Sequence, residues 1–182
     1  MPAVRWQPFQ LNPDIPATGM SRSEYIERKW GKSRGPDAYS RVAAVGTSVG
    51  IPFAFDKIAV QPNTLEAHRL LTYAERHGRQ NEVAEVLFKA YFIDGANLTD
   101  VNTLADIGAS GGLDRDALHA YLASDEDRTE VSNADISARS AGIGGVPFFI
   151  FNRRIGVSGA QDADVLLEAM EQASRTPAPA SE

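Results

Sequence analysis

The residue types that carry out most enzyme chemistry are few in this sequence. The 182 residues include no cysteine, which excludes a thiol nucleophile, a cysteine-ligated zinc ion and an iron–sulfur cluster within the chain. The three histidines, His68, His77 and His119, do not stand at ligand spacing from one another. We therefore expect no metal site.

Two glycine-rich stretches look like reactive loops but fit their surroundings better as chain breaks. Residues 108–112 read G-x-S-x-G, the pattern of a hydrolase nucleophile elbow, which follows a strand and opens a helix. Here a helical pattern leads into the glycines and Asp114 starts the next helix, so we predict a helix end. Residues 142–145 precede no helix, so they lack the helix N-terminus that binds phosphate.

A proline near the start of an apolar run is the most informative single feature. Residues 146–151 read as a buried strand, yet a proline at the second position, Pro147, conflicts with strand pairing. A cis peptide bond in a turn that enters the strand accommodates such a proline. Residues 152–154 read as a turn and residues 155–158 as a second strand, which predicts a hairpin.

The elements around this hairpin are predicted to be mostly helical. Residues 4–11 read as a short strand or an extended segment. Apolar spacing and capping residues predict helices over about 21–30, 37–48, 63–78, 83–91, 104–107, 117–122, 124–141 and 162–173. The order of strand, helices, hairpin and helix indicates an α/β fold with a helical subdomain inserted between two parts of a small sheet.

Charge and hydropathy exclude some partners. Lys and Arg number 18 against 24 Asp and Glu, a formal charge of −6, so we expect neither nucleic acid nor an anionic membrane surface as a partner. No apolar run is long enough to span a membrane. The first residues lack the apolar region of a signal peptide, so we expect a cytoplasmic location.

Four blocks of sequence stand in the order of a known family. They are RWQPFQLNP at 5–13, PNTLEAHR at 62–69, GVPFF at 145–149 and VSGAQ at 157–161. Together they resemble the DsbA-like thioredoxin-fold proteins of the FrnE type, which are related to 2-hydroxychromene-2-carboxylate isomerases and kappa-class glutathione transferases. The resemblance runs from about residue 4 to residue 173.

The resemblance implies a thioredoxin-like core with a large helical insertion. Residues 1–12 and 143–174 would form the core, 13–142 the insertion and 175–182 a disordered tail. Relative to the family, the chain lacks the first strand and helix, and with them the C-x-x-C motif or the serine of the isomerase and transferase branches. The missing strand would leave an open sheet edge, which invites pairing with another chain, for example in a homodimer.

The resemblance also implies a substrate-binding site. Pro147 matches the family's cis-proline, with the Val146 backbone facing a substrate thiol or disulfide. The loop of Ser158, Gly159, Ala160 and Gln161 resembles the stretch that holds the γ-glutamyl end of glutathione in the glutathione-using relatives. Asn63 and His68, which local reasoning explains as a helix cap and a structural histidine, are placed in the cleft between insertion and core. No catalytic residue is expected within the chain.

Three functions follow. The first is a DsbA/FrnE-like thiol–disulfide oxidoreductase that lacks its redox motif, is inactive as given, needs no cofactor and takes a thiol, a disulfide or a small molecule as substrate. The second is a glutathione-dependent isomerase or transferase, against which the Ala160-Gln161 pair counts because the transferases carry Ser-Asp in that loop. The third is a non-catalytic thioredoxin-fold module that docks a partner by strand addition.

Overall fold

A computed structural model of the protein describes residues 2–31 and 39–175. The chain divides into two compact units, Met1–Ala134 and Asp135–Glu182, which we call unit 1 and unit 2. Each unit is described by itself. The predicted boundaries of core and insertion stay a prediction.

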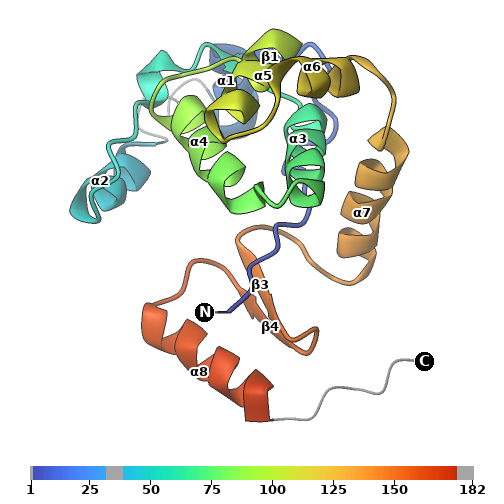
Figure 1. Ribbon diagram of the computed structural model, residues 1–182. Coiled ribbons are helices and arrows are strands. Elements are labelled where there is room, and N and C mark those ends of the chain that lie inside the picture. The colour runs from blue at the N-terminus through green and yellow to red at the C-terminus, as the bar shows by residue number, and fades with distance from the viewer. Residues whose placement is uncertain (1, 32–38, 176–182) are drawn as a thin grey trace. The chain divides into compact units, whose positions relative to one another are not determined.

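Unit 1 is built mainly from helices, shown in blue to yellow in Figure 1. Its elements are β1 Met20–Ser21, α1 Arg22–Trp30, α2 Ser40–Ser48, the 3-10 helix η2 Phe55–Lys57, β2 Val60–Gln61, α3 Leu65–Arg76, α4 Gln80–Phe92, α5 Val101–Ser110 and α6 Arg115–Ala123. The two short strands pair antiparallel, with Met20 opposite Gln61. The start predicted for the second helix, at 37–38, lies outside the described residues.

Local signals explain where these helices begin and end. The Ser21 hydroxyl accepts a hydrogen bond from the Glu24 amide at the start of α1, and Gly31 ends the helix with φ 77°. The Asp114 carboxylate accepts one from the Ala117 amide, 2.8 Å away, at the start of α6. Gly111 closes α5 in the same stretch, so the predicted helix end at the G-x-S-x-G pattern is confirmed.

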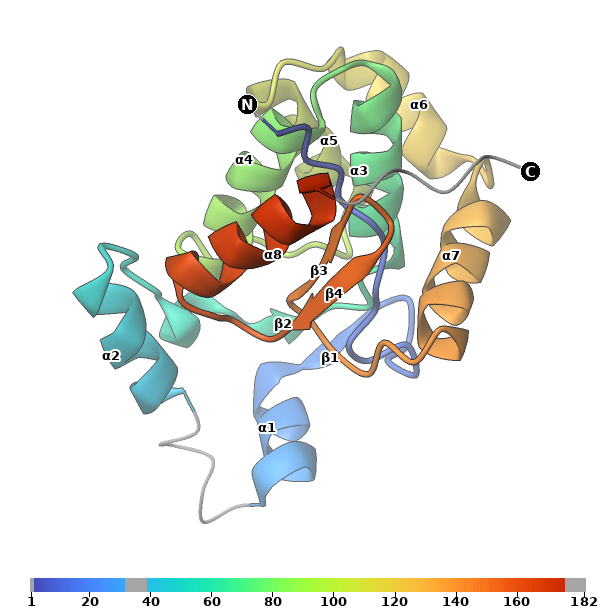
Figure 2. The same cartoon turned by 90° about the horizontal axis from the view of Figure 1, so that it is seen from below.

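The core of unit 1 lies among α3, α4, α5 and α6. Figure 2 shows α3, α4 and α5 side by side. Their facing side chains are nearly or fully buried: Leu70, Ala74, Val83, Leu104, Leu118 and Leu122. Gly108 lets α5 approach α6, because a Cβ there would overlap the Leu118 side chain.

Of the two forms predicted for residues 4–11, a short strand or an extended segment, the strand does not form. No strand in residues 2–31 or 39–175 pairs with them. Side chains of α4 hold this segment instead. The Gln80 amide accepts from the Trp6 N–H at 2.9 Å and donates to the Trp6 carbonyl at 3.1 Å. A single side chain thereby satisfies both backbone groups that a partner strand would have paired.

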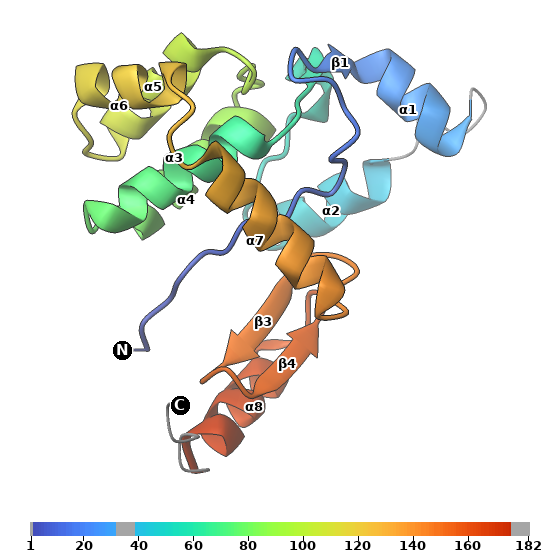
Figure 3. The ribbon, with the colours of Figure 1, turned by 90° about the vertical axis from the view of Figure 1, so that its right-hand side faces the viewer.

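Unit 2 consists of a hairpin and a helix. Helix α7, Arg128–Ser140, crosses the boundary between the units, and β3 Phe148–Phe151, β4 Ile155–Ser158 and α8 Ala163–Arg175 follow. The hairpin places Phe148 opposite Ser158 and Phe151 opposite Ile155, which confirms the predicted hairpin. Figure 3 shows α8 lying along the hairpin. The predicted tail from residue 176 onward lies outside the described residues.

The hairpin turn is tied to α8. Asn152 and Arg153 both have positive φ, and the Arg154 N–H donates to the Phe151 carbonyl at 3.0 Å, as in the type I′ turns that suit the strand twist. The Asn152 side-chain amide donates to the Ala173 carbonyl at 3.1 Å. Since α8 buries Ala169 and Ala173, small residues let the helix come close to the sheet.

Candidate functional site

The entry to β3 holds the first two predicted site residues. The Val146–Pro147 peptide bond is cis, where the sequence predicted one. The Val146 side chain is 46% exposed. Within the described part of the chain, no residue makes a hydrogen bond to the Val146 backbone. Unpaired backbone groups on an exposed residue just before a strand can pair with an extended segment of another molecule.

The loop from β4 to α8 lies directly against this entry. The Gly159 N–H donates to the Pro147 carbonyl at 2.9 Å, which fixes the proline against the loop. Gly159 has φ 82°, a conformation that favours glycine. The structure therefore brings Val146 and Pro147 together with the predicted loop, Ser158, Gly159, Ala160 and Gln161.

The loop is closed by one of its own side chains. The Gln161 amide nitrogen donates to the Ser158 carbonyl at 2.9 Å. The Asp162 carbonyl then accepts from the Val165 and Leu166 amides and starts α8. This donor of Gln161 is thus engaged within the loop, while the neighbouring Ala160 is exposed.

Asn63 and His68 lie in unit 1, where both hold the segment that precedes β1. The Asn63 amide donates to the Ile15 carbonyl at 2.7 Å, and its oxygen accepts from the Leu65 amide at 3.0 Å. The His68 ring nitrogen Nε2 lies 3.2 Å from the Phe9 carbonyl. The structure therefore places Asn63 just before α3 and His68 in the first half of that helix, and gives both structural partners.

A buried arginine in α1 escaped the sequence reasoning. Arg22 is 8% exposed and donates from Nη1 to the Gln61 side-chain oxygen. Its guanidinium lies 4.4 Å from the ring centroid of Tyr39. Burial raises the pKa of Tyr39 and, to about 12, that of Tyr91, although the Arg22 charge opposes both shifts. A basic residue in the first turn of a helix carries no sequence signal for burial.

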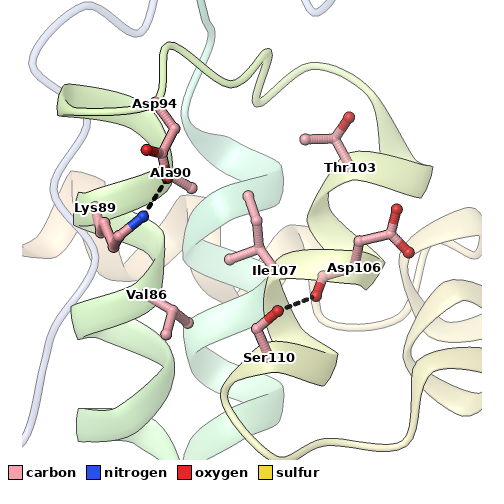
Figure 4. Close-up of a pocket in the computed structure, with 8 residues that line it drawn as sticks. All are labelled: Val86, Lys89, Ala90, Asp94, Thr103, Asp106, Ile107 and Ser110. Atoms are coloured by element: carbon pink, nitrogen blue, oxygen red, sulfur yellow. Dashed lines mark hydrogen bonds and ion pairs between the residues drawn. The ribbon is translucent and has the colours of Figure 1, made fainter. Parts of the chain in front are cut away.

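A shallow cavity of about 330 Å³ lies between α4 and α5 and was also missed. Figure 4 shows Val86, Ala90 and Ile107 along it, with polar side chains at the rim. All five polar side chains are engaged. Lys89 pairs with Asp94 at 2.6 Å, and the Ser110 hydroxyl donates to the Asp106 carbonyl at 3.0 Å. Thr103 donates to Asp100, and the Asp106 carboxylate pairs with Arg115. The Ser110 bond is a helical one, so this serine does not behave as a hydrolase nucleophile.

The described ranges hold neither a metal-ligand cluster nor a membrane-spanning helix. Residues 2–31 and 39–175 contain no cluster of three or more His, Asp or Glu side chains able to hold a metal ion. No helix in the same ranges is long and apolar enough to cross a membrane.

Comparisons with known proteins agree with one another. A family model described as a DSBA-like thioredoxin domain matches residues 2–171. The uncharacterized protein YwbO of Bacillus subtilis is 24% identical over 171 residues, which cover 92% of this chain and 80% of YwbO. The crystal structure of a probable DsbA oxidoreductase from Streptomyces coelicolor matches with a TM-score of 0.83 and 26% identity, over 96% of this chain and 76% of that one. The expected thioredoxin-like α/β fold, rich in helices and with small sheets, is therefore confirmed.

Proposed function

This chain belongs to the DSBA-like thioredoxin-domain family, and we propose that it serves as the substrate-binding part of a FrnE-type thiol–disulfide oxidoreductase of the cytoplasm. One observation carries the proposal. Val146 is exposed and its backbone has no hydrogen-bond partner in the described residues, and the carbonyl of the adjoining Pro147 is held by the Gly159 amide. An extended segment with a thiol or disulfide can pair with this backbone as with the edge of a sheet.

The chemistry needs a thiol from outside these 182 residues. In thiol–disulfide exchange an attacking thiolate forms a new S–S bond to one sulfur of the substrate disulfide, and the other sulfur leaves as a thiolate that takes up a proton. The chain has no cysteine, so neither the attacking nor the leaving sulfur is its own. Its residues bind and align the segment that carries the disulfide.

The proposal is tested by binding without reaction, which a chain free of cysteine allows. The ¹⁵N-labelled protein is titrated with a short peptide that contains one intramolecular disulfide, and amide shifts are followed. We expect the largest shifts at Val146 and Gly159. The Val146→Glu variant places a charge at the contact, so it should weaken binding about tenfold or more.

Val165→Glu is the matched control. Val165 lies on α8 of the same unit and is 43% exposed, against 46% for Val146, so this variant should bind like the unmodified protein. The proposal fails if the peptide shifts no amide around residue 146, or if Val165→Glu weakens binding as much as Val146→Glu.

The glutathione-dependent isomerase or transferase is the alternative for the same loop. Its glutathione would lie on residues 158–161, where the Gln161 donor is already engaged with the Ser158 carbonyl. Reduced glutathione separates the two functions. Saturable shifts confined to residues 158–161 would favour the glutathione enzyme, and shifts with the disulfide peptide alone favour the oxidoreductase.

The third function is a non-catalytic module that docks a partner by strand addition, which needs no cysteine. In that case β3 would pair with a strand of another chain, for example a second copy. Sedimentation of the protein with and without a thiol reductant tests this function. A stable dimer that persists in the reductant and does not bind the disulfide peptide would favour the docking module over the oxidoreductase.

A further inference from the structure

The guanidinium of Arg22 is a buried charge with few partners. The side chain is 8% exposed, and its Nη1 donates to the Gln61 side-chain oxygen. Its Nε is buried and meets no acceptor. Within the described residues no carboxylate pairs with it, and its side-chain acceptors, the Gln61 oxygen and the Tyr39 hydroxyl, are both neutral groups. A guanidinium has five N–H donors and no acceptor, and here the Nε donor is left without a partner while no anion balances the charge.

Aromatic rings surround this charge without satisfying it. The guanidinium carbon lies 4.4 Å from the ring centroid of Tyr39 and 5.6 Å from that of Tyr25. The Trp30 ring contacts both, with centroids 5.2 Å and 6.1 Å away. Ring faces attract a cation but do not accept its N–H groups in the plane of the guanidinium.

The tyrosines do not supply the missing counter-ion. Burial raises the pKa of Tyr39, so its hydroxyl stays neutral at pH 7. Burial acts in the same direction on Tyr91, whose hydroxyl lies 3.5 Å from the Gln61 oxygen that Arg22 contacts. A buried cation without an anion is unfavourable, so an anion that reached it would be bound with a gain in free energy.

We propose that Arg22 is the centre of an oxyanion-binding site in unit 1, taking the carboxylate or phosphate group of a small ligand. A guanidinium receives both groups through paired N–H donors. The half-buried ring of Tyr39 covers one face of Arg22, and we place the entry of the oxyanion beside this ring. The site belongs to unit 1 and does not depend on thiol chemistry.

Fluorescence of Trp30 offers a direct test, because its ring contacts the two tyrosines that flank Arg22. The protein is titrated with sodium phosphate and, separately, with sodium succinate, each against sodium chloride at equal ionic strength. We expect a saturable change with one or both oxyanions and none with chloride. The tighter of the two identifies phosphate or carboxylate as the preferred group.

Two arginine variants show whether the oxyanion binds at Arg22. Arg22→Gln should weaken binding about tenfold or more, since a charged hydrogen bond is lost. Arg28→Gln, an exposed position on the same helix that pairs with Glu24, should bind within about twofold of the unmodified protein. Equal loss in both variants, or no loss in Arg22→Gln, overturns the proposal.

A second measurement keeps the test decisive if Arg22→Gln does not fold. The Nε–Hε signal of Arg22 is observed by ¹⁵N NMR in the unmodified protein and assigned by its absence in Arg22→Lys. Added oxyanion should shift this signal along a saturable curve. A signal that stays at its original position with both phosphate and succinate overturns the proposal.

Discussion

Replacing Arg69 should cost unit 1 a large part of its stability. Arg69 lies on α3 and is fully buried. Its Nε and Nη atoms donate to backbone carbonyls after and within the end of α6, at 2.9 Å to Glu126, Tyr121 and Ser124 and at 3.1 Å to Leu122. It also pairs with the Glu66 carboxylate. One side chain thus donates to four carbonyls at and just after the end of α6, where helix carbonyls lack intrahelical donors; the Tyr121 carbonyl also accepts from the Ser124 amide and hydroxyl.

The expected cost of Arg69→Met follows from these contacts. Each hydrogen bond to a charged group contributes about 1.5–3 kcal/mol, but adding all of them would exceed the stability of many domains, about 5–15 kcal/mol. Neighbouring bonds are not additive. Glu66 also keeps a second partner, Arg128, at 2.7 Å. We therefore expect a loss of about 3–5 kcal/mol, the range for breaking a buried charged contact.

Urea unfolding followed by circular dichroism measures this loss. Arg28→Met is the control, because Arg28 is exposed and its pair with Glu24 is of the i,i+4 kind, worth about 0.3–0.5 kcal/mol. If Arg69→Met loses less than about 1 kcal/mol, or no more than the control, Arg69 does not hold the end of α6 as argued.

Two further predictions concern a residue of the candidate site and a buried tyrosine. Asn63→Ala removes the bond to the Leu65 amide and the bond to the Ile15 carbonyl, so it should lower the free energy of unfolding by about 1–2 kcal/mol. Asn81→Ala, which loses one exposed bond from the Trp6 indole, should cost less in the same urea series, and equal costs would contradict the structural role of Asn63. Burial raises the pKa of Tyr91 from 10.0 to about 12, so the fold favours the neutral phenol. The stability it contributes is fully present below about pH 10 and is lost as the pH rises towards 12. Tyr91→Phe should flatten that decline in unfolding curves across this range, and an unchanged slope would show that another group titrates.

Elements with local signals were the ones that could be predicted from the sequence. The hairpin follows from an apolar run, a turn at 152–154 and a second run, and the two predicted strands do pair with each other. Asp114 and the glycines before it mark the break between α5 and α6. In each case the residues that decide the structure lie within a few positions of one another.

Features that depend on distant partners could not be predicted in this way. The strands β1 and β2 are two residues each and pair across about forty positions of sequence, too short for a periodic pattern. Residues 4–11 were predicted to be a short strand or an extended segment. The Gln80 side chain takes the place of a partner strand at Trp6, because it pairs with both backbone groups of that residue.

The burial of two charged residues could not be predicted from the sequence either. Arg22 and Arg69 were not singled out, because arginine is seldom fully buried and the acceptors of Arg69 lie more than fifty residues away. The residues of the candidate site also differ in whether their contacts are local or long-range in sequence. Val146, Pro147 and residues 158–161 meet through the short hairpin, whereas the contacts of Asn63 and His68 with residues 9–15 are long-range.

The bond between the Gly159 amide and the Pro147 carbonyl has a consequence for how this family can diverge. It joins two backbone groups, so it is kept whatever side chains stand at positions 158, 160 and 161. Only position 159 is restricted, by its positive φ. Substitutions at positions 158, 160 and 161 can therefore change the surface beside Val146 while the Pro147 carbonyl keeps its donor. The chemistry of this surface can change without loss of the hydrogen bond that holds the loop to the hairpin.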